Sequence, residues 1–194
     1  MAYHTDFDPY YCYDGTTTLI NRFGIRDRDE LLRREATIVT VNIARFKASR
    51  IPGSFDRDHL CAIHRALFGD VYDWAGKFRT VDIAIGIPFC TAQYIGTNLD
   101  ALFGDLREEN YLKGLDKDVF VRRFAFYFGE LNAIHPFREG NGRTQRLFFE
   151  YLAESAGYDI DFIDVGREMM ADACEAAMYG DYGPLESMMY CLLS

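Results

Sequence analysis

The apolar stretch from residue 116 to residue 134 restricts the fold of this chain more than any other feature. Its hydrophobic positions recur at helical spacing and cover a wide surface. A helix that is apolar over most of its circumference must be surrounded by other elements. We therefore expect a central helix with neighbours on most sides. The positions are Val119, Phe120, Phe124, Phe126, Tyr127, Phe128, Leu131 and Ile134.

Amphipathic stretches before and after the central one predict further helices, and Asp27 and Asp56 are suited to cap two of them. One stretch, 78–90, alternates with period two and predicts a small β-hairpin that Pro88 keeps at an edge. The fold class is therefore all-α, a helical bundle with one hairpin. We expect a single domain over 1–194 with an N-terminal arm over 1–25. The other expected helices cover 27–48, 56–68, 91–109, 141–156, 165–178 and 184–193.

The composition excludes several classes of function. The formal net charge is −9, so direct nucleic-acid binding is not expected, because it depends on an excess of Lys and Arg that releases counterions. No run approaches the roughly 18 apolar residues of a membrane span, and no signal peptide is visible. The five scattered cysteines form no C-x-x-C pair and are expected as free thiols. We expect a cytoplasmic protein, with delivery into a host or recipient cell as the alternative.

Twelve residues directly after the central helix combine groups suited to phosphate chemistry. Asn141-Gly142 opens a helix, whose first N–H groups have no internal partners and whose dipole is positive at that end. Glycines at 140 and 142 let backbone amides approach an anion closely. Arg143 and Arg146 lie three apart and share a helix face. The stretch is His135-Pro136-Phe137-Arg138-Glu139-Gly140-Asn141-Gly142-Arg143-Thr144-Gln145-Arg146.

Three further residues of this stretch have distinct expected roles. Glu139 is placed to hold Mg²⁺, since one carboxylate together with substrate phosphates is the usual arrangement for this cation. His135 has an ordinary pKa near 6.5, which suits a general base. Phe137 is expected to point into the core and anchor the loop.

Residues 135–146 resemble the Fic-family signature H-P-F-x-[D/E]-G-N-G-R-x-x-R at every specified position. The segments 70–76 and Gly180-Asp181 are similar to recurring features of that family. Asp8-Pro9-Tyr10 and residues 21–25 resemble bacterial toxin-type Fic proteins, which a separate antitoxin inhibits, and Bartonella-type secreted Fic effectors.

The resemblance implies transfer of AMP from ATP to a Tyr, Thr or Ser hydroxyl of a target protein. It implies that His135 deprotonates that hydroxyl, that Glu139 holds Mg²⁺, and that Arg146 contacts the γ-phosphate. The hairpin would be a flap over the nucleotide that pairs with the target backbone, with Ile83 and Ile85 as docking residues. The implied ATP-binding residues are Glu139, Gly140, Asn141, Gly142, Arg143 and Arg146 from the signature, and Ile83, Ala84, Ile85 and Gly86 from the flap.

Two alternatives remain open. The Doc branch of the family phosphorylates its target but has Lys where this chain has Gly142, whereas transfer of another nucleotide such as UMP is not distinguished by the signature. A catalytically silent binding module is the second alternative, which intact His135 and Glu139 disfavour.

Many Fic proteins are restrained by a helix with the pattern [S/T]-x-x-x-E-[G/N], whose glutamate pairs with the second signature arginine. Glu followed by Gly or Asn occurs here at Glu109 and Glu139, and the residues four positions earlier, Asp105 and His135, do not fit. We therefore expect a small antitoxin to supply this helix in trans beside Arg146.

Overall fold

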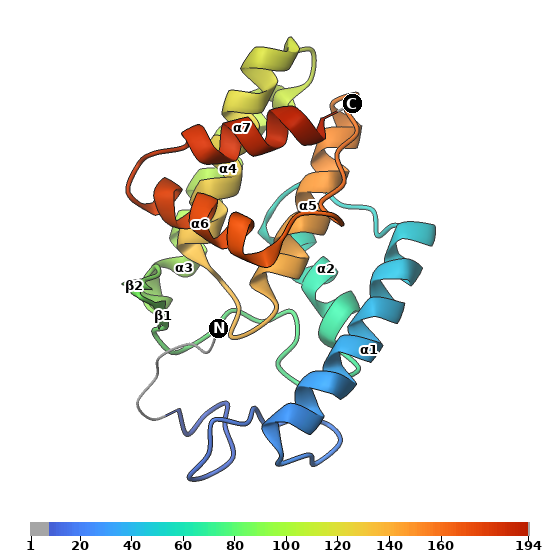
Figure 1. The fold of residues 1–194 in the computed structure, drawn as a ribbon, viewed down its shortest axis with the longest axis vertical. Coiled ribbons are helices and arrows are strands. Elements are labelled where there is room, and N and C mark those ends of the chain that lie inside the picture. The colour runs from blue at the N-terminus through green and yellow to red at the C-terminus, as the bar shows by residue number, and fades with distance from the viewer. Residues whose placement is uncertain (1–7, 194) are drawn as a thin grey trace.

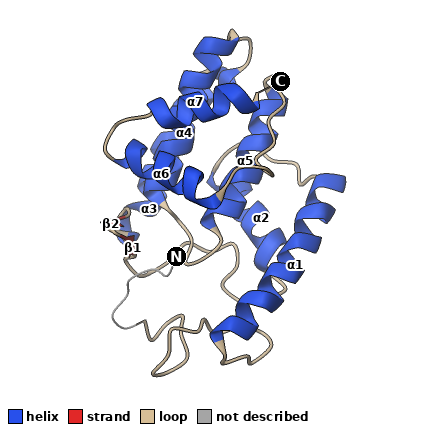
Figure 2. Cartoon of the chain, viewed as in Figure 1, coloured by secondary structure: helices blue, strands red, loops and turns tan. Residues whose placement is uncertain are grey.

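A computed structural model describes residues 8–193, and helices account for most of this part of the chain (Figures 1 and 2). The first seven residues of the predicted arm lie outside it. Within the described residues, no helix has both the length and the apolarity needed to cross a bilayer. The helices are α1 (Arg28–Ala48), α2 (Arg57–Phe68), α3 (Ile95–Glu108), α4 (Lys117–Ile134), α5 (Asn141–Ser155), α6 (Arg167–Met178) and α7 (Gly183–Leu192), with 3₁₀ turns η1 (Ala92–Tyr94) and η2 (Asn110–Leu112).

Helix α4 is the central element. It packs against α3, α5, α6 and α7, and its aromatic residues Phe120, Phe124 and Tyr127 are fully buried. Helices α1 and α2 lie on the far side of α5 (Figure 1), where α2 contacts both α1 and α5. The expected central helix is confirmed, and its C-terminus and the N-terminus of α5 meet at the signature stretch.

Aspartates at the N-caps set the start of three helices. Each accepts a hydrogen bond from the backbone N–H three residues later, which satisfies a donor that the helix itself leaves without a partner. The expected starts at Asp27 and Asp56 are confirmed. The bonds run from Glu30 N to Asp27 (2.8 Å), from His59 N to Asp56 (2.8 Å) and from Val119 N to Asp116 (3.1 Å).

The hairpin is much shorter than the expected 78–90. Only β1 (Ala84–Ile85) and β2 (Ile87–Pro88) pair, antiparallel, around Gly86 at φ 72°. One further bond joins the two sides, from Phe89 N to Ile83 O (3.1 Å). Beyond it the backbone groups bond outside the hairpin: Cys90 N donates to Ala133 O, and the oxygens of Val81 and Cys90 accept from the Arg79 guanidinium. The remainder of this segment is irregular.

The described part of the N-terminal arm packs on the signature stretch. Tyr11 is buried and its ring meets Trp74 edge-on at 5.6 Å. Asp8 accepts from Arg138 Nε at 2.6 Å, and both side chains are buried. The arm therefore connects the start of the described chain to the loop between α4 and α5.

Candidate active site

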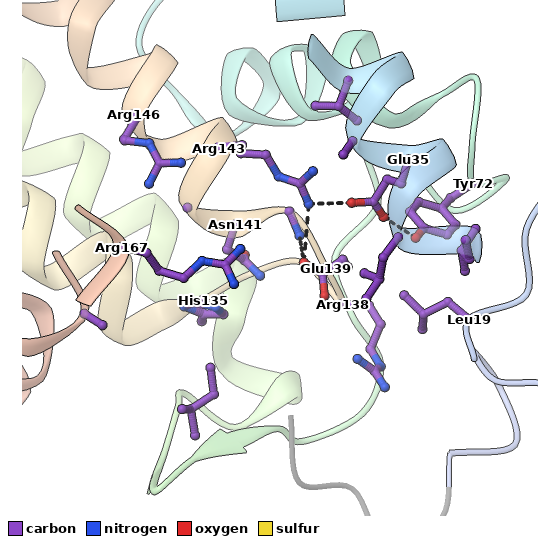
Figure 3. Close-up of a pocket in the computed structure, with 18 of the residues that line it drawn as sticks. Leu19, Glu35, Tyr72, His135, Arg138, Glu139, Asn141, Arg143, Arg146 and Arg167 are labelled. Atoms are coloured by element: carbon purple, nitrogen blue, oxygen red, sulfur yellow. Dashed lines mark hydrogen bonds and ion pairs between the residues drawn. The ribbon is translucent and has the colours of Figure 1, made fainter. Parts of the chain in front are cut away.

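His135 stands where α4 stops. Its backbone adopts the left-handed conformation, with φ 48° and ψ 63°, while its N–H still donates to Leu131 O at 3.1 Å. Pro136 explains the stop, because a residue before proline is disfavoured in the helical conformation. The turn directs the His135 ring into the pocket (Figure 3).

The surroundings of the His135 ring hold it as a neutral base. Nδ1 lies 3.1 Å from the carbonyl oxygen of Asn132, and because a carbonyl only accepts, Nδ1 carries the proton and Nε2 is the basic nitrogen. The ring stacks on Phe89 with centroids 3.9 Å apart. Burial, together with the nearby charge of Arg79, lowers the pKa of His135 to about 3.

The N-terminus of α5 is shaped by Gly140, which is its N-cap at φ 83°. A Cβ at this position would lie 2.3 Å from the Phe68 ring, so only glycine fits. Asn141 braces the loop: its side chain accepts from Phe137 N at 2.8 Å and donates to Phe137 O at 2.7 Å. The Asn141 side chain is therefore committed to the loop, and what remains for an anion is the row of backbone N–H groups that opens α5.

Phe137 is the anchor that the sequence predicted. It is 1% exposed and stacks on His64, with ring centroids 3.8 Å apart. His64 accepts from Gly76 N at Nδ1 (2.8 Å), so its Nε2 carries the proton and donates to Glu139 O (2.9 Å). Burial lowers the pKa of His64 to about 4. This histidine thus ties α2 and the Gly76 turn to the signature loop.

Glu139 and Arg143 lie next to each other at the N-terminus of α5. Glu139 accepts from Gly140 N at 2.9 Å and lies 3.5 Å from Arg143 Nη2. Arg143 also donates to Glu35 of α1 at 2.7 Å, and Tyr72 donates to the same carboxylate (Figure 3). Desolvation, and then the negative charge of Glu35, raise the pKa of Glu139.

Arg146 is the second signature arginine and lines the same pocket as Arg143. Within residues 8–193 its side chain has no hydrogen bond or ion pair, in contrast to Arg143. Figure 3 places Arg146 and Arg167, from the first turn of α6, on the side of the pocket opposite Glu35. Two cations are thus presented where an anion would not have to displace a carboxylate.

The pocket has a volume of about 1590 Å³ and extends from the hairpin past the signature loop to the space between α1 and α6. In the described residues no group of three His, Cys, Asp or Glu side chains could hold a metal by itself. Glu139 nevertheless fits a Mg²⁺ site of the kind completed by phosphates, because its side chain is 30% exposed, faces the pocket and, within residues 8–193, accepts a hydrogen bond from Gly140 N alone.

The flap residues are distributed differently from expectation. Ile85 lines the pocket together with Ile87 and Phe89. Ile83 is only 3% exposed, so its expected role as a docking side chain is wrong in this conformation: the residue faces inward. Ala84 and Gly86 do not line the pocket.

Arg79 connects the flap to the base, a role that the sequence did not reveal. Its guanidinium is fully buried and donates to the backbone oxygens of His135 (2.9 Å), Ile134 (3.2 Å) and Val81 (2.8 Å). The last carbonyls of a helix lack internal partners, so this cation also caps α4.

Glu35 was missed as well, although a signal exists. It occupies a buried stripe of α1 together with Leu31, Val39 and Phe46. A carboxylate at an otherwise apolar position of this kind requires a buried partner, and here the partners are Tyr72 and Arg143.

A model of the Fic/DOC family matches residues 54–153, which is more than half of the chain. The chain belongs to the Fic/DOC family. The match contains the hairpin and the whole signature stretch, whereas Glu35 on α1 and Arg167 on α6 lie outside it.

Relatives of this Fic chain are named protein adenylyltransferases. It is 42% identical over 180 residues to protein adenylyltransferase VbhT of Bartonella schoenbuchensis, covering 92% of this chain and 37% of VbhT. It is 38% identical over 188 residues to the probable protein adenylyltransferase Fic of Escherichia coli, covering 96% and 92%. The structure of BepC, a VirB-translocated effector of Bartonella tribocorum with bound AMPPNP, matches with a TM-score of 0.87 at 33% identity and covers 95% and 96%.

Burial of His64 and His135 predicts acid sensitivity of this Fic fold. Below pH 6.5 an unfolded histidine binds a proton, while native His64 and His135 stay neutral down to pKa values of about 4 and about 3. The free energy of unfolding therefore falls as the pH falls, by about 2 kcal/mol per histidine between pH 7 and pH 5.

Urea unfolding of wild type and His135→Asn at pH 7 and pH 5 checks this. Glu139 shifts the balance in the opposite direction, because its raised pKa favours the native state in acid. The comparison between the two proteins removes that contribution. We expect the wild type to lose about 2 kcal/mol more than the variant, and equal losses would contradict a neutral buried His135.

Proposed function

We propose that this chain is a protein adenylyltransferase, which transfers AMP from ATP to a Tyr, Thr or Ser hydroxyl of a target protein. The observation that carries the proposal is the position of His135, a neutral base whose basic nitrogen is Nε2, in the same pocket as Arg143, Arg146 and the N-terminus of α5. The names of its relatives and the AMPPNP bound by BepC support it.

AMP transfer requires two main contributions from the protein: a base for the hydroxyl proton and a positively charged surface for the phosphates. The target oxygen forms a bond to the α-phosphorus of ATP, the bond from that phosphorus to the β-phosphate oxygen breaks, and pyrophosphate leaves. The hydroxyl proton passes to His135 Nε2. Negative charge builds up on the leaving group, so cations placed there stabilise the transition state more than the ground state.

The residues divide this work by position. Arg146 neutralises the terminal phosphate, Arg143 the neighbouring one, and the backbone N–H groups from Asn141 onward hold the phosphates. Glu139 would hold Mg²⁺, which would offset negative charge on the phosphate oxygens. The hairpin covers the nucleotide, with Ile85 facing it and the exposed edge available to the extended backbone of a target.

Two radiolabels test the reaction directly. Incubated with a bacterial or host cell lysate, the wild type should add label from ATP carrying ³²P at the α position that His135→Ala does not add, and the two proteins should give equal labelling from the γ position. Extra labelling from the γ position by the wild type would instead indicate phosphorylation, and labelling from α-³²P UTP in place of ATP would indicate UMP transfer. If α-labelled ATP adds no label to any protein, the proposal fails.

We further propose that the chain acts as a toxin or a secreted effector whose ATP site is closed by a separate small antitoxin. The pocket continues from Arg146 into an apolar stretch between α1 and α6, where Leu32 is 48% exposed and Ile163 is 80% exposed. A helix with apolar residues on one face and a glutamate at its end would cover these side chains and pair with Arg146.

Co-expression with the small open reading frame next to the gene tests this partner. We expect the lone chain to inhibit bacterial growth and the pair to grow normally, and Leu32→Glu in the toxin should restore growth inhibition in the pair. If the lone chain modifies no protein and is tolerated by the cell, the trans-inhibition proposal fails.

A further inference from the structure

Glu35 is a buried acid that reaches the signature loop from α1. Its side chain is 4% exposed and accepts from Tyr72 Oη and, at 2.7 Å, from Arg143 Nη2. Tyr72 is itself 2% exposed, and burial followed by the charge of Glu35 raises the pKa of its hydroxyl. Tyr72 therefore keeps its proton and donates a hydrogen bond to the Glu35 carboxylate, which fixes the position of that carboxylate.

Two carboxylates, those of Glu35 and Glu139, lie near the Arg143 guanidinium. Its Nη2 lies 2.7 Å from Glu35 and 3.5 Å from Glu139, and its guanidinium carbon sits 4.6 Å from the centre of the Phe68 ring. The shorter contact goes to the acid on α1. Without that acid, the nearest carboxylate to the guanidinium is Glu139, four residues earlier on the same helix start, and an arginine paired there would compete with a metal ion.

The net charge of Glu35, Glu139 and Arg143 also supports a role for Glu35 in binding the cation. Glu35 and Glu139 together with Arg143 leave one net negative charge at this end of the pocket. A divalent cation is attracted to that site, whereas a nucleotide phosphate without a cation is repelled. Neutralising Glu35 would reduce the attraction and the repulsion alike.

We propose that Glu35 is a positioning residue for the Mg²⁺–nucleotide complex: it holds Arg143 and thereby leaves the Glu139 carboxylate available to the cation. The proposal rests on the proposed function, because it assumes that Glu139 receives Mg²⁺ with a nucleotide. Glu35 lines the same pocket, but its hydrogen bonds go to Tyr72 and Arg143, so it acts on the cation site through Arg143.

The chain contains a matched control for this arrangement. Glu109 accepts from both Arg123 and Tyr127, another glutamate, arginine and tyrosine joined by the same types of bond. None of the three lines the pocket. Glu109→Gln therefore removes a similar carboxylate while the ATP site stays unchanged.

Calorimetric binding of AMPPNP to Glu35→Gln tests the proposal without turnover. For each protein the dissociation constant is measured in saturating Mg²⁺ and in EDTA, and the ratio of the two gives the enhancement by Mg²⁺. We expect Glu35→Gln to lower the enhancement about tenfold while affinity in EDTA is equal or tighter. Glu109→Gln should keep the wild-type enhancement within about twofold, since its charge lies outside the pocket.

The outcomes separate this inference from simple damage to the fold. Weaker binding by Glu35→Gln to the same degree with and without Mg²⁺ would indicate a distorted pocket and would overturn the proposal, as would an unchanged enhancement. If Glu35→Gln does not fold, Glu35→Asp keeps the charge and must retain the enhancement within about twofold, and a tenfold loss overturns the proposal. A wild type that binds no AMPPNP would instead refute the proposed function.

Discussion

Replacing His135 with alanine is expected to lower AMP transfer by about 10²–10⁴-fold, the usual loss when a general base is removed. The reason is that Nε2 of this ring is the basic nitrogen presented to the pocket by the hydrogen bond from Nδ1 to Asn132. A target tyrosine has a pKa near 10 and needs an acceptor for its proton. AMPPNP affinity should change little, because the base takes a proton from the target and binds no phosphate.

His59→Asn is the control for the removal of a buried histidine. His59 is 3% exposed on α2 and does not line the pocket. The His59→Asn substitution should lower the thermal midpoint of unfolding without altering the rate of AMP transfer measured with α-labelled ATP. Transfer by His135→Ala at a rate close to wild type, with the variant folded by circular dichroism, would contradict the assignment of the base.

Gly140→Ala is expected to destabilise the fold by about 3 kcal/mol and to abolish transfer, because a left-handed non-glycine residue is strained and an overpacked core must shift. The new Cβ would lie 2.3 Å from the Phe68 ring at a residue whose φ is 83°. Phe68 is fully buried, so its ring has no space into which to withdraw. Urea unfolding and the transfer assay measure the two effects.

Gly142→Ala is the matched comparison two residues later. Its Cβ would meet nothing closer than Arg146 Nη1 at 3.6 Å, and its φ is not positive. Stability should be equal or higher, since alanine favours a helix over glycine by about 1 kcal/mol. AMPPNP affinity should nevertheless fall, because the added methyl group lies beside the backbone N–H groups proposed to hold the phosphates. Equal stability of the two variants would contradict the packing argument for Gly140.

The local features of this molecule were predictable and the long-range ones were not. The central helix, the aspartate caps and the signature loop follow from periodicity and from the residues themselves. Glycine was expected at position 140 for the approach of an anion, whereas the Phe68 ring also requires it. The ion pair between Glu35 and Arg143 spans 108 positions, and no local pattern specifies which charges meet at that separation.

The predicted length of the hairpin was wrong for a related reason. Alternation predicted strands over 78–90, but the backbone groups at the ends of this segment bond elsewhere: Cys90 N donates to Ala133 O, and the oxygens of Val81 and Cys90 accept from Arg79, so the paired strands are two residues long on each side. Ile83, in the same segment, faces inward and is 3% exposed. Alternation in the sequence indicates which residues can face one side of a strand. It does not indicate whether their backbone N–H and C=O groups form hydrogen bonds with groups outside the sheet.

The buried ion pair between Asp8 and Arg138 sets a lower limit on any working fragment of this protein. A fragment restricted to the family-matched residues 54–153 would lose Asp8, and with it the 2.6 Å contact to the signature loop. It would also lose Glu35, the partner of Arg143. Removing one member of a buried pair costs about 3–5 kcal/mol, a large part of the stability of an ordinary domain. The signature is twelve consecutive residues long, yet a fragment that keeps its geometry must also include Asp8 and Glu35.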